Sequence, residues 1–239
     1  MKTIKIDKYF KGMIAHRGLS GIETENTVFS YLAAANHTYT GISCDLYTSK
    51  DGRLILTAES SLLKYGLLNL DIQSFDYEEL VKYSLVDRKI NNLNRYLYVP
   101  LLRDLLSIGK AYEKKIIIHL HPSLTTVDLN NMLRVIHDGY LLEQCFFVSK
   151  KTNQIEYLLD SVQSNHIFLD HGDKESQYYE FMNMHKVNAY LQKDLINKDY
   201  IKKCHLIGLK VMTGIVNEKE QAERLVKLDI DYMLTDILE

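Results

Sequence analysis

Short apolar runs rich in β-branched residues recur along the chain, and each run is followed by a segment with helical spacing. This alternation is typical of a parallel sheet, because parallel neighbours have to be joined by a crossover, usually a helix. We predict eight strands, at residues 13–16, 41–46, 116–120, 145–148, 166–169, 189–191, 210–212 and 232–234. Eight strands in this alternation predict an α/β fold of the (β/α)8 type, the TIM barrel.

Amphipathic helices are predicted between these strands. Apolar residues share a helical face in three segments: Val28, Tyr31, Leu32 and Ala35; Leu102, Leu105, Leu106 and Gly109; and Leu129, Met132, Leu133 and Ile136. Helix N-caps are expected at Asn26–Thr27, Asp76, Thr125–Thr126 and Asn197, and helix ends at Gly109, Gly139 and Gly208. Periodicity and capping residues therefore predict the same crossover helices.

The stretch from Arg53 to Arg95 departs from the strand–helix repeat. Residues 54–57 indicate an extra short strand, and a helix is expected near residues 77–83. We interpret the stretch as a small insertion after the second strand, beside the mouth of the barrel, where ligands meet the carboxyl ends of the strands. With two prolines and no Gly/Ser linker in the chain, we predict a single domain over residues 1–239.

Composition limits the partners expected for such a barrel. The formal net charge is -2 and charged residues make up 25% of the chain, so no nucleic-acid partner is predicted. The Lys-rich start lacks the apolar stretch of a signal peptide, and the chain has no run of about 18 apolar residues that could span a membrane. These two features predict a cytoplasmic protein. Cys44, Cys145 and Cys204 have no Cys-x-x-Cys spacing and are expected as buried thiols. The oligomeric state stays open.

Polar side chains lie at the ends of several predicted strands. His16 and Arg17 end the first strand, Asp45 lies near the end of the second, and His119 and His121 end the third. Residues two apart in a strand face the same way, so His119 and His121 can look into one cavity. We expect Arg17, Asp45 and His119 to surround one anion-binding hollow. Further candidates of the same kind are Asp170–His171, Gln192 and Thr235–Asp236.

Several of these residues lie in motifs that resemble those of the glycerophosphodiester phosphodiesterase family. The motifs are Ala15-His16-Arg17-Gly18, Glu25-Asn26-Thr27 at a helix start, Asp45 followed by Thr48-Ser49-Lys50-Asp51-Gly52, Pro100-Leu101-Leu102, Val216-Asn217 and Leu234-Thr235-Asp236. They follow the family's order and spacing across nearly the whole chain. The resemblance implies a TIM barrel and, as the ancestral reaction, cleavage of a glycerophosphodiester to glycerol 3-phosphate and an alcohol.

Several positions depart from the family pattern. The family uses two histidines as acid and base and a divalent metal, magnesium or calcium, held by three carboxylates. The first histidine matches His16, whereas the second falls on Ala58. Asp45 matches one metal carboxylate, while the other two fall on Ser43 and His119. The resemblance therefore implies a divergent metal site and the loss of one proton-transfer group.

One interpretation is that the protein still hydrolyses glycerophosphodiesters. His16 would then act as acid or base, and Arg17 would clamp the phosphate with its fork of N–H donors. Glu25 would orient Arg17, and His121 would contact the phosphate or the metal. The substrate is a small phosphodiester or phosphorylated ligand, and the residues do not identify its alcohol portion.

A rebuilt metal site belongs to this interpretation. Asp45 and His119 are the expected ligands, and imidazole donors favour Zn²⁺ or Mn²⁺ over the Mg²⁺ or Ca²⁺ of the family. Glu59, next to the lost histidine, is a candidate general acid, although strand alternation can point it away from the site.

Two other interpretations stay open. The barrel is catalytically inactive and binds a phosphorylated or glycerol-like ligand or a protein partner, in which case the metal is absent. Alternatively, the barrel runs a different reaction on a small phosphorylated substrate, since one fold hosts many reactions. His171 has no counterpart in the family motifs, and we expect it at the surface.

Overall fold

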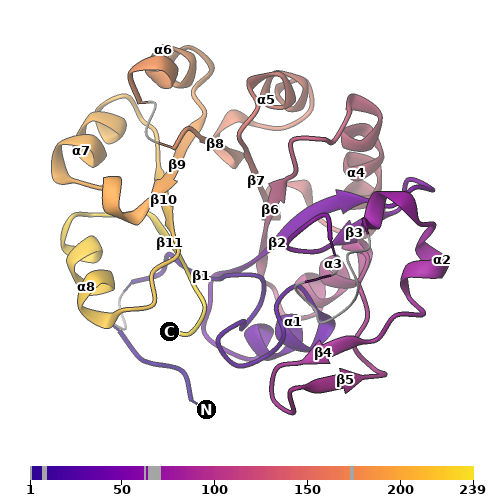
Figure 1. Ribbon diagram of the computed structural model, residues 1–239. Helices are drawn as coiled ribbons and strands as arrows, with labels where there is room; N and C mark the ends of the chain where they lie inside the picture. Colours follow the sequence, from indigo (N-terminus) through magenta and orange to yellow (C-terminus); the bar gives the residue numbers. More distant parts are fainter. Residues whose placement is uncertain (1, 7–9, 62, 64–70, 173–174) are drawn as a thin grey trace.

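A computed structural model describes the chain apart from residues 1, 7–9, 62, 64–70 and 173–174. Eight parallel strands form a closed barrel surrounded by helices (Figure 1). They are β1 (Met13–Ala15), β2 (Gly41–Thr48), β6 (Lys115–Leu120), β7 (Cys145–Ser149), β8 (Ile167–Asp170), β9 (Asn188–Gln192), β10 (Val211–Gly214) and β11 (Tyr232–Thr235). Strand β1 pairs with both β2 and β11, which closes the sheet. The predicted TIM barrel and its eight strands are confirmed.

Helices connect the barrel strands, and three of them begin after a residue whose side chain caps them. They are α1 (Val28–Ala35), α3 (Leu102–Ala111), α4 (Thr126–Gly139), α5 (Thr152–Leu159), α6 (Glu175–His185), α7 (Lys198–Leu206) and α8 (Lys219–Lys227), with short 3-10 helices η3 (Leu142–Gln144), η4 (Ser164–His166) and η5 (Lys193–Leu195). The side chains of Thr27, Thr125 and Asn197 each accept a backbone N–H from the first turn of α1, α4 and α7. These three predicted N-caps are confirmed.

Two details of the predicted helices are wrong. Gly109 lies inside α3 and does not end it. A β-carbon at this position would come within 2.8 Å of Ile116 in β6. Glycine here lets α3 approach the sheet closely. Leu32 is 36% exposed, whereas Tyr31 is fully buried, so the buried face of α1 is turned by one position from the predicted face.

Side chains along the strands alternate between the barrel interior and the layer under the helices. The interior cluster contains Ile14, Ile117, Phe146, Val148, Phe168, Met212 and Leu234. His119 follows Ile117 by two residues, so it continues the interior column of β6 at the carboxyl end. In the register of β2 with β6, Ser43 lies opposite Ile117 and Asp45 opposite His119. Cys44 falls in the outer layer, and all three cysteines are buried free thiols, as expected.

The insertion after β2 builds a small structure of its own. It contains β3 (Leu54–Leu56), antiparallel to β2, then η2 (Ile72–Ser74), α2 (Tyr77–Leu80), and a hairpin of β4 (Leu85–Asp87) and β5 (Asn92–Asn94). The extra strand and the N-cap at Asp76 are confirmed, while α2 is shorter than expected and the hairpin was not predicted. A separate apolar cluster that includes Ile55, Leu85 and Leu97 fixes the insertion beside the barrel mouth.

Candidate functional site

A cavity of about 840 Å³ opens at the carboxyl ends of the barrel strands. His16, Arg17, Asp45, His119 and His121, five of the six candidate residues, all line it. Glu25 reaches the site through its contact with Arg17. Other residues of the wall include Tyr47, Ala58, Lys150, Asp170, His171, Tyr190 and Gln192. Segments that are far apart in the sequence therefore meet around one hollow, as the barrel topology requires.

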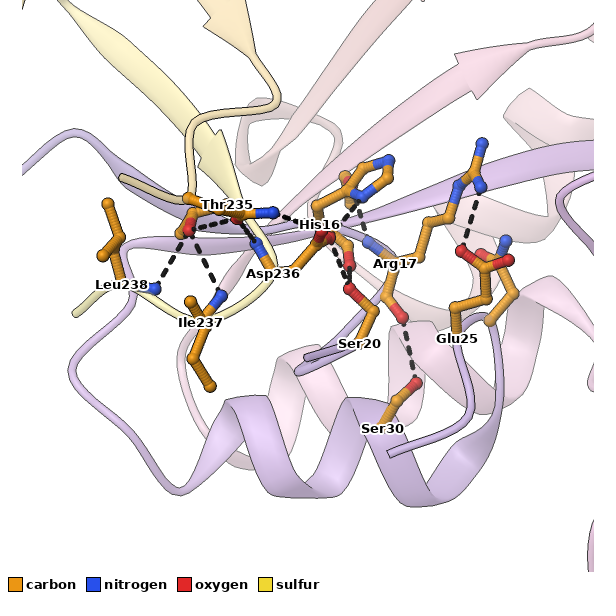
Figure 2. Close-up of polar contacts among 12 residues, drawn as sticks. His16, Arg17, Ser20, Glu25, Ser30, Thr235, Asp236, Ile237 and Leu238 are labelled. Carbon is orange, nitrogen blue, oxygen red and sulfur yellow. Dashed lines mark hydrogen bonds and ion pairs between the residues drawn. The ribbon is translucent and has the colours of Figure 1, made fainter. Parts of the chain in front are cut away.

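His16 is held by the carboxylate of Asp236, the residue that follows the last strand, β11 (Figure 2). Its Nδ1 lies 2.8 Å from Oδ1 of Asp236, which also accepts a hydrogen bond from Ser20, and Oδ2 of Asp236 accepts one from Asn217. Burial of Asp236 disfavours its charged form, but these hydrogen bonds outweigh that effect and hold its pKa well below the usual range. The carboxylate is therefore ionised at neutral pH and fixes the proton of His16 on Nδ1, which leaves the Nε2 lone pair available.

Arg17 adopts a backbone conformation that is rare for a residue with a side chain. Its φ is 55°, its N–H donates to Ser43 Oγ over 3.0 Å, and its carbonyl accepts a hydrogen bond from Ser30 Oγ (Figure 2). Such strain persists when surrounding contacts enforce it, and it is found most often at functional sites. The turn places the guanidinium between two carboxylates, with Nη1 2.9 Å from Glu25 and Nε 2.5 Å from Asp45.

Asp45 has a second partner that the sequence did not predict. Asn26 donates from Nδ2 to Oδ2 of Asp45 over 3.0 Å, and its Oδ1 accepts from the Asp45 backbone N–H and from the Tyr31 hydroxyl. Asn26 is buried and has a φ of 50°, a conformation that asparagine tolerates better than most residues. One oxygen of Asp45 is therefore shared between Asn26 and Arg17.

His119 presents a neutral imidazole with an unsatisfied nitrogen. Its Nε2 is enclosed and has no hydrogen-bond partner among the described residues, and the edge of its ring contacts Tyr190 at 5.4 Å between centroids. Burial lowers the pKa of His119 to about 4, against the opposing attraction of Asp45. The ring is therefore uncharged at neutral pH, and its unprotonated nitrogen can accept a hydrogen bond or coordinate a cation.

His121 is oriented differently from His16. Its ring stacks on Tyr47 with 4.1 Å between centroids, and burial lowers its pKa. The backbone N–H of Ser123 donates to Nδ1 over 3.2 Å, and the Ser123 hydroxyl lies 2.7 Å from the same nitrogen. Because Nδ1 accepts, the neutral ring carries its proton on Nε2. The two histidines thus hold opposite tautomers, one suited to accept a proton and the other to donate a hydrogen bond.

The opposite wall carries groups whose roles were not predicted. Lys150 Nζ lies 3.8 Å from Asp170 Oδ2, and burial raises the pKa of that carboxyl. His171 is buried and its Nε2 lies 2.6 Å from the Tyr200 hydroxyl, so the expected surface position is wrong. The reason is that α7 brings Tyr200 against the end of β8. Glu59 is exposed, and the cavity wall at this point is formed by Ala58.

The donor set does not fit the oxygen-rich metal site implied by the family resemblance. Mg²⁺ and Ca²⁺ require about six or more oxygen ligands, mostly from carboxylates, carbonyls and water. The nearby carboxylates already have partners: Arg17 and Asn26 share one oxygen of Asp45, Glu25 pairs with Arg17, and Asp170 pairs with Lys150. No three His, Cys, Asp or Glu side chains within the described part of the chain are grouped to hold a metal ion.

Comparison with known proteins agrees with the geometry. The model of the glycerophosphoryl diester phosphodiesterase family matches residues 16–239. A glycerophosphodiester phosphodiesterase of Bacillus altitudinis is 20% identical over 230 residues, 94% of each chain, and the uncharacterized protein YqiK of Bacillus subtilis is 22% identical over 234 residues, 95% of each. The structure of an Oleispira antarctica phosphodiesterase in complex with the product sn-glycerol-3-phosphate has a TM-score of 0.84 at 16% identity, covering 97% of this chain and 95% of that one. The family model spans nearly the entire sequence, and the chain therefore belongs to the glycerophosphoryl diester phosphodiesterase family.

Proposed function

We propose that the cavity binds glycerophosphodiesters and hydrolyses them to sn-glycerol 3-phosphate and an alcohol. The observation that carries this proposal is the pair of His16 and Asp236 beside the Arg17 guanidinium on one cavity wall. A base oriented by a carboxylate and a phosphate-binding cation supply two of the functions that this hydrolysis uses. The phosphorylated product bound to the Oleispira antarctica relative supports the same ligand class.

Arg17 is proposed to bind the phosphoryl oxygens. Glu25 and Asp45 hold two of its nitrogens, so the guanidinium loses little freedom when a ligand arrives. Its planar fork suits two oxygens of one phosphoryl group. His121 supplies a second donor, because its Nε2 carries the proton in the neutral ring.

His16 is proposed to transfer the proton. Its Nε2 takes a proton from the attacking water while the water oxygen bonds to phosphorus, and Asp236 stabilises the imidazolium that forms. The bond from phosphorus to the alcohol oxygen then breaks, that oxygen takes a proton from solvent water, and the His16 imidazolium returns its proton to solvent. Ala58 occupies the position of a second histidine and cannot transfer protons, so we expect turnover to be about 10²-fold slower than with two such groups.

The activity is tested by measuring sn-glycerol 3-phosphate released from glycerophosphoglycerol and glycerophosphocholine. We expect His16→Ala to lower kcat by about 10²-fold and Arg17→Lys to raise KM, because lysine lacks the planar fork. His137→Ala is the matched control, since His137 is exposed on α4 away from the cavity. Turnover unaffected by His16→Ala would contradict the catalytic assignment.

A non-catalytic binding function is the second candidate, and Ala58 at a proton-transfer position favours it. Calorimetric titration with sn-glycerol 3-phosphate separates the two. Binding that depends on Arg17, together with no turnover of either diester above the His16→Ala background, would identify a binding protein.

The donor set also predicts the metal preference. Asp45 and the free Nε2 of His119 are the two donors that a cation could share, and an imidazole donor favours Zn²⁺ or Mn²⁺ over Mg²⁺ or Ca²⁺. When bound there, such an ion would add positive charge beside the phosphate. We expect Zn²⁺ or Mn²⁺ titrated calorimetrically to bind at least about ten-fold more weakly to His119→Ala, with His137→Ala unchanged. Tight Mg²⁺ or Ca²⁺ binding, or equal Zn²⁺ affinity in both variants, would rule the site out.

A further inference from the structure

The hairpin of β4 and β5, together with the four residues that follow it, exposes large apolar side chains. Ile90 is 61% exposed, Leu93 53%, Tyr96 60% and Tyr98 41%, and these four lie within nine residues. Figure 1 shows the hairpin at the outer edge of the molecule, beyond α1. Single exposed apolar residues are common on proteins, but four within nine residues are a candidate interaction surface. We call these four side chains, together with the cations Arg88, Lys89 and Arg95, the hairpin surface.

Three cations lie among these apolar residues. Arg88 contacts the carbonyl of Ser20, Lys89 pairs with Glu23, and Arg95 lies 4.7 Å from the centre of the Tyr96 ring. Asp87 is the one carboxylate between residues 85 and 98, and it is buried and bonded to Asn94 and the Lys89 backbone N–H. With Asp87 and Glu23 counted against these three cations, the hairpin surface carries one net positive charge on a chain with a formal net charge of -2.

The hairpin is fixed to the loop that carries part of the candidate site. Thr24 Oγ1 donates to the Val86 carbonyl over 3.0 Å and accepts the Arg88 N–H over 2.9 Å. The same loop contains Arg17 and Glu25. On its inner side, Leu85 is buried in the apolar cluster of the insertion. The apolar side chains are thus displayed on a supported element next to the cavity.

We propose that the hairpin surface docks on an anionic lipid membrane. Tyrosine together with arginine and lysine is the combination that concentrates at the membrane–water interface, where apolar side chains enter the acyl boundary and cations meet anionic headgroups. The four apolar side chains expose roughly 500 Å², less than the about 800 Å² per partner of a typical stable protein interface. No described helix has the length and apolar character to cross a bilayer, so the contact is peripheral.

This docking would place the cavity beside a surface whose lipids contain the phosphodiester group. It does not depend on the hydrolysis proposed above, because neither the apolar residues nor the cations of the hairpin line the cavity. Hydrolysis of a water-soluble glycerophosphodiester is therefore expected to be the same in hairpin variants and in the unaltered protein.

Sedimentation of the full chain with vesicles tests the proposal. We expect binding to phosphatidylcholine vesicles that contain phosphatidylglycerol, and weak binding to phosphatidylcholine alone. Arg95→Gln should weaken the anionic binding about five-fold at low salt, the factor for one cation at such a surface, with a smaller effect at high salt. Leu93→Ser should weaken it at every salt concentration.

Matched controls come from α7, on another part of the barrel. Leu206 is 75% exposed and Lys202 is exposed, so Leu206→Ser and Lys202→Gln alter the same side-chain types elsewhere and should leave vesicle binding unchanged. Equal binding of all four variants, or no preference for anionic vesicles, would overturn the proposal. So would a concentration-dependent dimer that Leu93→Ser abolishes, because a second copy would then be the occupant.

Discussion

At the scale of single residues, the candidate site depends on how charges and protons are fixed before a ligand arrives. Asp236 is ionised because donors from His16, Ser20 and Asn217 compensate its burial. Its charge lies against Nδ1 of His16, so it favours the cationic ring that forms when Nε2 accepts a proton. In the proposed hydrolysis, Asp236 is a positioning residue that acts through His16.

Replacing Asp236 tests this coupling. Asp236→Asn keeps the shape of the side chain but removes the charge that would stabilise the imidazolium. We expect kcat for glycerophosphodiester hydrolysis to fall roughly 10²-fold, with KM changed little, because the phosphate contacts of Arg17 remain. Steady-state kinetics measure both, with Asp138→Asn, an exposed position on α4, as control. A raised KM at constant kcat would instead indicate a structural role.

The sequence predicted the candidate residues better than their partners. His16, Arg17 and Asp45 could be located because the carboxyl ends of all barrel strands meet at one face of the barrel, so polar residues at these ends lie near one another. The partner role of Asp236 was missed because β11 and β1 become neighbours through closure of the barrel. The contact of Asn26 with Asp45 was also missed, since its sequence position indicated a helix cap. Long-range closure and side-chain direction were the missing information.

At the scale of elements, the barrel strands were predictable because both faces of each strand are buried, one by the barrel interior and the other by the helices. Such strands are continuous apolar runs, as in Ile116, Ile117 and Ile118 of β6, which are all fully buried. Their boundaries agree with the structure within two residues. Helix starts were predictable where a capping side chain is followed by apolar periodicity, as at Thr27 and Thr125.

The hairpin of β4 and β5 could not be predicted in the same way. Each strand has three residues, and β5 reads Asn92-Leu93-Asn94, without a run or an alternation that identifies a strand. The hairpin is held by contacts to distant residues, such as the hydrogen bond of Thr24 to Val86. Such tertiary contacts override weak local preferences.

At the scale of the whole molecule, the two ends of the described chain are joined outside the barrel. Residues 4–6 form backbone hydrogen bonds with residues 237–239, beside the pairing of β1 with β11. Figure 1 shows both ends at the same side of the barrel. The Glu239 carboxylate, with 3% of its side chain exposed, contacts Lys5, Thr3, His37 and Thr38. One buried charge therefore connects three segments that are far apart in the sequence.

Removal of this charge should destabilise the barrel in a pH-dependent way. Burial disfavours the charged form of Glu239, but hydrogen bonds from Lys5, Thr3 and Thr38 outweigh it and hold the pKa well below the usual range. A depressed pKa in the folded state stabilises the protein above the unfolded value of about 4.3, and this stabilisation is lost as the pH falls below it. We expect Glu239→Gln to lower the free energy of unfolding in urea by about 2 kcal/mol at pH 7, with the difference narrowing below about pH 4. Glu223→Gln, which removes an exposed partner of Lys219 on α8, should change it by less than about 0.5 kcal/mol. A loss that is the same at every pH would show that shape, and not charge, makes Glu239 stabilising.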